Sequence, residues 1–159
     1  MASDDKTSPS PLANLITEAR EGRLTVRMDL EKFVYLDRDC EYFKIAILQI
    51  QGAMTEVANQ DKWGLGEKFE KQGDRDLISA KTMVSRWREK SQSTQNPNNI
   101  YDVMASHYKV IEDFQTLFRT VRERLTGVDT DQATKYKDLE ANLPKQPPAQ
   151  AKIFSWPGL

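Results

Sequence analysis

One long series of apolar residues constrains the fold of this chain more than any other feature. Residues 29–60 contain no proline and one glycine, and apolar side chains recur there at alternating spacings of three and four. This is the spacing of a helix that packs along its length on another helix. At about 1.5 Å per residue the helix is roughly 50 Å long, so its apolar stripe predicts a partner helix. The stripe consists of Phe33, Leu36, Cys40, Phe43, Ile47, Ile50, Met54 and Val57.

A second pattern of the same kind lies within residues 98–125. One row repeats the spacing of three and four, and a flanking row recurs every seven residues. Together the two rows make a face wider than a contact with one helix needs, so the flanking row is predicted to bind a third helix of the chain or another molecule. The first row is Ile100, Val103, His107, Val110, Phe114, Leu117 and Val121. The flanking row, the predicted partner interface, is Met104, Ile111, Phe118 and Leu125.

Three shorter segments complete an all-α prediction. Residues 12–21 form an amphipathic helix that Gly22 ends, and residues 79–90 form a helix with Ser79 as its cap. A last helical segment, capped by Asp129 or Thr130, runs to residue 143 and ends before a proline. Residues 23–28 are predicted to be a short extended link. The predicted fold is a long antiparallel helical hairpin with an extra short helix inserted at its tip.

The predicted helical domain covers residues 12–143, between tails at residues 1–11 and 144–159. Both tails are polar and rich in proline, which favours disorder. No apolar run approaches the roughly 20 residues that span a bilayer, and residues 1–11 do not resemble a signal peptide. A net charge of −1 argues against binding of nucleic acid through its phosphates. We expect a cytoplasmic protein, at least before any export. Secretion or attachment to the cell envelope without a cleaved signal peptide stays open.

Few residues of this chain suit catalysis. It has one histidine and one cysteine, and it has none of the common nucleophile, zinc or phosphate-loop motifs. His107 and Cys40 lie on the predicted inward faces, where core roles are favoured, and a nucleophile–base pair of the two is the enzyme alternative. We therefore expect no catalytic residue, no metal site and no cofactor. Two acidic pairs are interpreted as solvated charge, since no further metal ligands are near: Asp37 with Asp39, and Asp74 with Asp76.

Two short motifs occupy notable positions in the predicted hairpin. Trp63, Gly64 and Gly66 lie where the first long helix should end, because each glycine costs about 1 kcal/mol inside a helix. Tyr136 and Glu140 are four residues apart in the last segment, a spacing that puts ring and carboxylate on one helix face. With the hairpin, these motifs resemble the WXG-type (ESX) proteins of actinobacterial type VII secretion.

The resemblance implies a role for each motif. Trp63, Gly64 and Gly66 would form the turn between helices, and Tyr136 and Glu140 would form part of the export signal. Two hairpins would combine into a four-helix dimer. The glycine comes one residue later than in the family, and about 30 residues separate the turn from the second long helix. The chain is therefore identified as a divergent or secretion-associated relative.

The implied function is that of a non-enzymatic secretion substrate or accessory protein. Its expected partner is another helical-hairpin protein or a second copy, with a secretion ATPase or a chaperone as a further partner. The alternative is an intracellular helical adaptor or scaffold without a secretion role. In that alternative the short helix around Trp87 covers the wide face, and the tail residues Ile153, Phe154 and Trp156 dock elsewhere.

Overall fold

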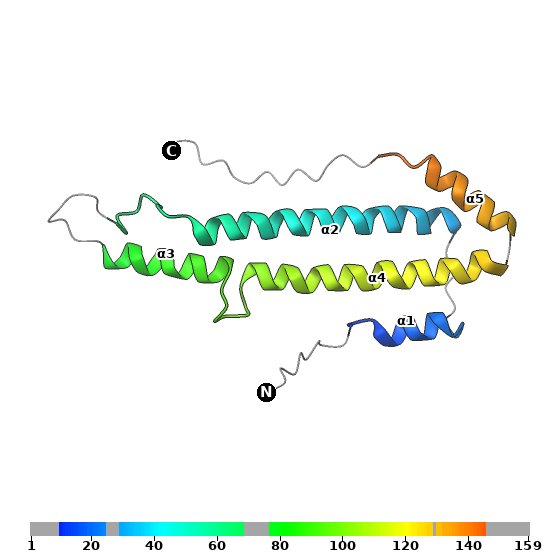
Figure 1. Cartoon of the computed structure of the whole chain (residues 1–159), viewed down its shortest axis with the longest axis horizontal. Coiled ribbons are helices and arrows are strands. Elements are labelled where there is room, and N and C mark those ends of the chain that lie inside the picture. Colours follow the sequence, from blue (N-terminus) through cyan, green and yellow to red (C-terminus); the bar gives the residue numbers. More distant parts are fainter. Residues whose placement is uncertain (1–9, 25–28, 69–76, 129, 146–159) are drawn as a thin grey trace, which may run out of the picture. The chain divides into compact units, whose positions relative to one another are not determined.

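The fold is all-helical in the part of the chain that the computed structural model describes, residues 10–24, 29–68, 77–128 and 130–145. These residues form five helices and no strand, which confirms the predicted fold class (Figure 1). The helices are α1 (Ala13–Arg20), α2 (Leu30–Asn59), α3 (Ile78–Ser91), α4 (Ile100–Val128) and α5 (Thr130–Ala141). The predicted tail ends at 1–9 and 146–159, most of the extended link and Asp129 lie outside the described residues.

The helix ends follow local sequence with one exception. Gly22 has a φ of +74° after α1, and Gly64 and Gly66 have φ values of +71° and +84° after α2, a conformation that glycine adopts without steric cost. The exception is Ser79, which lies inside the first turn of α3. Leu77 takes the capping position there without a side-chain hydrogen bond. No helix in the described ranges has the length and apolarity to cross a bilayer.

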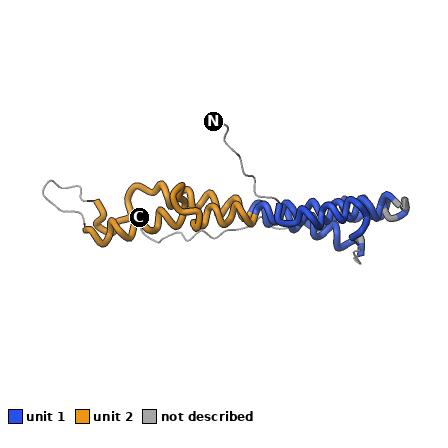
Figure 2. Tube along the Cα trace, turned by 90° about the horizontal axis from the view of Figure 1, so that it is seen from below, with its two compact units in different colours: residues 1–45, 108–149 blue, residues 46–107, 150–159 orange. Residues whose placement is uncertain are grey.

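The chain forms two compact units, coloured separately in Figure 2. Unit 1 comprises residues 1–45 and 108–149, and unit 2 comprises residues 46–107 and 150–159. Helices α2 and α4 each contribute to both units, whereas α1 and α5 belong to unit 1 and α3 to unit 2.

The core of unit 1 combines side chains from four helices. α1 lies along α4 in the same direction, since the Leu12 N–H donates to Asp113 Oδ2 at 3.1 Å and Gly22 lies beside Arg124. The ring of Phe33 on α2 meets that of Phe118 on α4 edge to face, with centroids 6.5 Å apart. The buried members of this core are Ile16, Ala19, Phe33, Val34, Leu117, Val121 and Tyr136.

A polar layer joins α2 and α4 within unit 1. The buried Gln115 donates to Asp37 Oδ1 at 3.1 Å and to Glu41 Oε1 at 2.7 Å, and its own Oε1 accepts from Lys44 Nζ at 3.0 Å. The guanidinium of Arg119 donates to both oxygens of Asp37, at 2.6 and 3.1 Å. As residue numbers rise along α2, the residue numbers of the contacted side chains on α4 fall, so the two helices are antiparallel here. Asp37 is thus part of a helix contact, which corrects its interpretation as solvated charge.

Unit 2 is held by contacts from α2, α3 and the start of α4. Gln51 donates to the Tyr101 carbonyl at 3.1 Å, and Arg88 Nη2 donates to the Gln60 carbonyl at 2.5 Å. The buried Asn99 caps α4, because its Oδ1 accepts from the Asp102 N–H at 2.9 Å. The contacts of Gln51 and Arg88 join the C-terminal part of α2 and the residue after it to the next two helices of the chain, α4 and α3.

Candidate functional site

Not all residues of the flanking row of α4 are exposed on the surface. Phe118 packs on Phe33 and on the core of unit 1, whereas Leu125 is 38% exposed. Met104 and Ile111 are half-buried. The prediction that this row forms a partner interface is therefore wrong for Phe118, because Phe118 packs against α2 of the same chain. For Leu125 an interface role stays a prediction.

The first row of α4 is covered along only part of its length. Leu117 and Val121 are buried with Ile16 and Ala19 of α1, which lies beside residues 113–124 of α4. Phe114 of the same row is 38% exposed although it belongs to unit 1. The members of the row in unit 2 are exposed, and we call these three residues the open row: Ile100 (44% exposed), Val103 (38%) and His107.

The open row corrects the predicted core role of His107. Its side chain is exposed, because no described element of unit 2 covers this side of α4. On α2, the stripe residue Phe43 is likewise 55% exposed, whereas Cys40 is buried as predicted. Burial and the carboxylate of Asp37 raise the pKa of the Cys40 thiol, which disfavours the nucleophilic thiolate.

The Trp63 turn encloses a carboxylate that sequence analysis missed. The Trp63 N–H donates to Glu67 Oε1 at 2.5 Å, and the Leu65 N–H donates to Glu67 Oε2 at 2.9 Å. The positive φ angles of Gly64 and Gly66 curve the backbone around this side chain. Successive backbone N–H groups that converge on an anion form a nest. An acidic residue directly after a glycine-rich turn is the signal that could have indicated it.

The ring of Trp63 packs within unit 2. It lies 5.1 Å from the ring of Trp87 on α3, measured between centroids. Its indole Nε1 is buried and has no hydrogen-bond partner among the described residues. The turn therefore ends α2 and binds α3, and Trp87 contacts this turn.

Lowering the pH is expected to loosen this turn. Backbone N–H groups, with that of Trp63 first, hold the pKa of Glu67 below its ordinary value of 4.5. The folded pKa lies below the unfolded one, so the stabilisation is complete above the ordinary value and is lost as pH falls through the folded pKa. Tryptophan fluorescence of a Trp156→Phe background should shift to the red below about pH 4.

Two matched variants distinguish protonation of Glu67 in this turn from general unfolding of the chain by acid. Glu67→Gln should show the shifted spectrum already at pH 7, because a neutral amide cannot replace the nested carboxylate. Glu56→Gln, a change of an exposed acid on α2, should titrate like the parent. Equal titration of both variants would contradict the assignment.

Tyr136 and Glu140 of α5 differ in burial. Tyr136 is 7% exposed, its hydroxyl accepts from Arg122 Nη1 at 2.6 Å, and the guanidinium lies 4.6 Å from the ring centroid. Glu140 is exposed. Burial raises the pKa of the Tyr136 hydroxyl although Arg122 opposes this shift. The structure therefore makes Tyr136 a core residue of unit 1, and Glu140 is the exposed member of the pair.

Residues with metal-binding chemistry do not cluster in the described ranges. No group of three or more His, Cys, Asp and Glu side chains is placed to hold a metal ion there. Asp39 accepts from Arg38 Nε at 2.9 Å, and Asp74 and Asp76 lie outside the described residues.

Comparison with known proteins finds no significant match for this chain among family models, curated proteins or solved structures.

Proposed function

We propose that this chain is a non-enzymatic helical protein that acts by helix–helix association with another helical-hairpin protein or with a second copy. The observation that carries the proposal is the open row, Ile100, Val103 and His107. Farther along α4 the same row is covered by α1, at Leu117 and Val121. A row that packs on one helix over part of its length offers a matching surface to a second helix over the rest.

Further apolar side chains of unit 2 support an interaction surface. α3 exposes Met83, Trp87 and Ile78, the last of which is 82% exposed. Single exposed apolar residues are ordinary on protein surfaces. Two helices of one unit that each expose several of them favour association.

In the proposed assembly α2 and α4 are the two arms of one long antiparallel hairpin. The ordered contacts of Gln115 and Arg119 with α2 support this pairing in unit 1. Helix α3 is then the insertion between the arms. Two such hairpins would bury their remaining apolar rows in a four-helix bundle.

The secretion role rests on the resemblance to WXG-type proteins, and we propose a substrate or accessory protein of such a pathway. The end of α2 before Trp63 and the place of Tyr136 and Glu140 in α5 support it. Glu140 is accessible to a secretion ATPase or a chaperone. Because Tyr136 is buried, a receptor that reads it requires α5 to leave the core of unit 1.

Ile100→Glu is expected to weaken the association about 100-fold or more, because the contact would bury an unpaired carboxylate. Sedimentation velocity measures it, on the full chain alone and with the helical-hairpin protein encoded nearest to it. The matched control is Ile45→Glu, which changes a slightly more exposed isoleucine of α2 and should leave association unchanged.

Two results of this experiment would contradict the proposal. One is a wild-type chain that stays monomeric alone and with the candidate partner. The other is an association that Ile45→Glu weakens as much as Ile100→Glu does, which would show that the open row is not the contact.

A further inference from the structure

One face of helix α2 is covered by other residues near the start of the helix and is exposed farther along. Residues at intervals of seven share a helix face, and on α2 one such series consists of Glu31, Arg38, Ile45 and Gly52. Ile45 is 51% exposed, and Leu48, three residues later on the same face, is 54% exposed. Gly52 is exposed too, and a Cβ added there would meet no side chain within 4 Å. We call Ile45, Leu48 and Gly52 the α2 patch.

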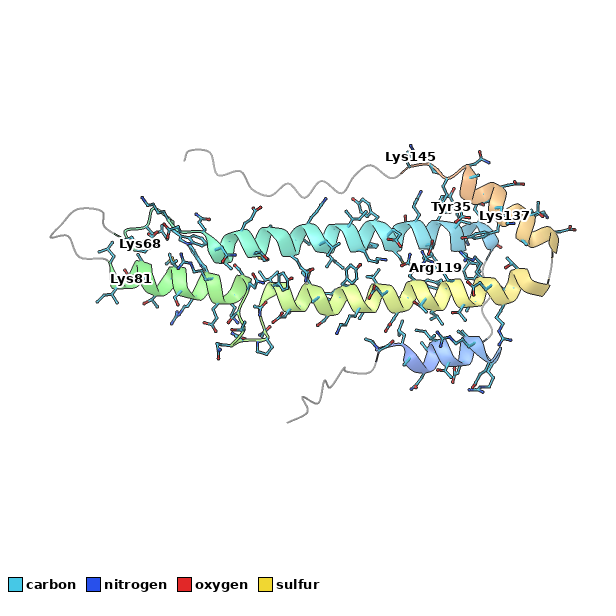
Figure 3. All side chains as sticks on the ribbon, in the orientation of Figure 1. Tyr35, Lys68, Lys81, Arg119, Lys137 and Lys145 are labelled. Atoms are coloured by element: carbon cyan, nitrogen blue, oxygen red, sulfur yellow. The ribbon has the colours of Figure 1, made fainter. Side chains whose placement is uncertain are left out.

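The chain that leaves α5 runs along this face in the direction of the α2 patch. A small pocket between the two helices is lined by residues 31, 34 and 35 of α2 and by residues 139, 142 and 143. The carbonyl of Pro144, farther along the chain, accepts from Arg38 Nη1 at 3.2 Å. Figure 3 shows Lys145, the last described residue, on the same side of α2 as Tyr35. The contacts on α2 thus advance from residues 31–35 to Arg38, and Ile45 follows Arg38 in the series.

The tail after Lys145 carries an apolar cluster and is long enough to reach the α2 patch. Residues 146–152 contain no large apolar side chain, whereas the next four residues hold three, the tail cluster of Ile153, Phe154 and Trp156. An extended, proline-rich segment rises about 3.1 Å per residue, so the roughly eight steps from residue 145 to the tail cluster span up to about 25 Å. At about 1.5 Å per residue, Gly52 lies about 21 Å beyond Arg38 along α2. Every residue of the α2 patch is therefore within reach of the tail cluster.

We infer that the tail folds back along α2 and that the tail cluster packs on the α2 patch. The apolar side chains of the cluster and of Ile45 and Leu48 lose contact with water when they meet. Gly52 has no side chain, which leaves room for an aromatic ring beside Leu48. The tail is tethered to α2 at Pro144, so the effective concentration of the cluster is on the order of millimolar and a weak contact suffices. The tail then covers an apolar face of α2, and a partner of that face has to displace it.

The test is limited digestion of the full chain with trypsin, in which mass spectrometry measures the initial rate of cleavage after Lys152. A docked tail is cleaved only while it is detached, so this rate follows the population of the detached state. Leu48→Glu places a carboxylate against the tail cluster and should raise the rate about tenfold. The control is Phe43→Glu, because Phe43 is 55% exposed but lies on the opposite side of α2 from Ile45. It should change the rate less than about twofold.

A second variant tests the tail cluster without a change in α2. Trp156→Ala should raise the rate as much as Leu48→Glu does, and circular dichroism checks that each variant keeps its helices. The synthetic peptide 146–159 gives the rate for an undocked tail, and cleavage of the parent chain at that rate would overturn the inference. So would equal acceleration by Phe43→Glu, or protection that rises with protein concentration, which would place the tail on a second copy. The open row is not involved, so these outcomes are independent of the proposed association.

Discussion

Replacing Phe33 by alanine is expected to lower the free energy of unfolding by about 3–5 kcal/mol. Phe33 is buried in the core of unit 1, where its ring packs edge to face on Phe118 and where α1, α4 and α5 all contribute side chains. The truncation leaves a cavity in the core, because the four helices around it cannot all move inward to fill the space. Urea unfolding followed by circular dichroism at 222 nm measures the loss.

Phe43→Ala is the matched control for this prediction. It is the same substitution on the same helix, but Phe43 is more than half exposed. Its expected effect on the free energy of unfolding is within about 0.5 kcal/mol. A similar loss in both variants would show that the core of unit 1 is not where the structure has it.

Tyr136→Ala is expected to cost about 3–5 kcal/mol of stability, since it removes a buried ring together with the hydrogen bond from Arg122. Tyr136→Phe keeps the ring and loses only the hydroxyl, so its expected cost is about 1.5–3 kcal/mol, the usual value for a hydrogen bond with a charged partner. Urea unfolding separates these values. Equal stability of Tyr136→Ala and the parent would contradict the packing of α5 on unit 1.

This prediction determines how an export signal in α5 has to be tested. Loss of export in Tyr136→Ala would follow from unfolding as readily as from loss of a signal. Glu140→Ala is the informative variant, because Glu140 is exposed and its removal should leave the free energy of unfolding within about 0.5 kcal/mol. Loss of export by a folded Glu140→Ala chain would support the secretion role. Unchanged export would favour the adaptor alternative.

Sequence periodicity predicted the helices well because it is a local property. The absence of proline and the spacing of apolar residues place α2 and α4 within about three residues of their observed ends. The glycines after α2 and α1 likewise act through their own backbone angles. Burial of Cys40 followed from its place in the middle of the stripe.

The sequence did not allow us to predict in the same way which helices pack against each other. Periodicity gives the angle between Leu117 and Phe118 on α4, but not which neighbouring helix lies on each side. Contacts with α1 and α2 are made between residues about 80 to 100 positions apart in the chain, so no local pattern records them. His107 was assigned to the core for this reason, although its row is covered only farther along α4.

The polar contacts between helices were not predicted, because charged residues in a sequence are usually interpreted as facing solvent. Gln115, Asp37 and Glu41 satisfy one another only when α2 and α4 are side by side. The Glu67 nest depends on two positive φ angles and one side-chain rotamer together. Such arrangements need the fold before they can be recognised.

The layer around Gln115 also limits which alignments of α2 and α4 are tolerated. An all-aliphatic stripe accepts a partner shifted by one helical turn with little loss of buried area. Here such a slip would leave Asp37 and Glu41 without the amide and guanidinium groups that now donate hydrogen bonds to them. Misaligned or foreign helices would lose these hydrogen bonds against this part of α2, so the layer favours α4 in its observed alignment over other apolar helices.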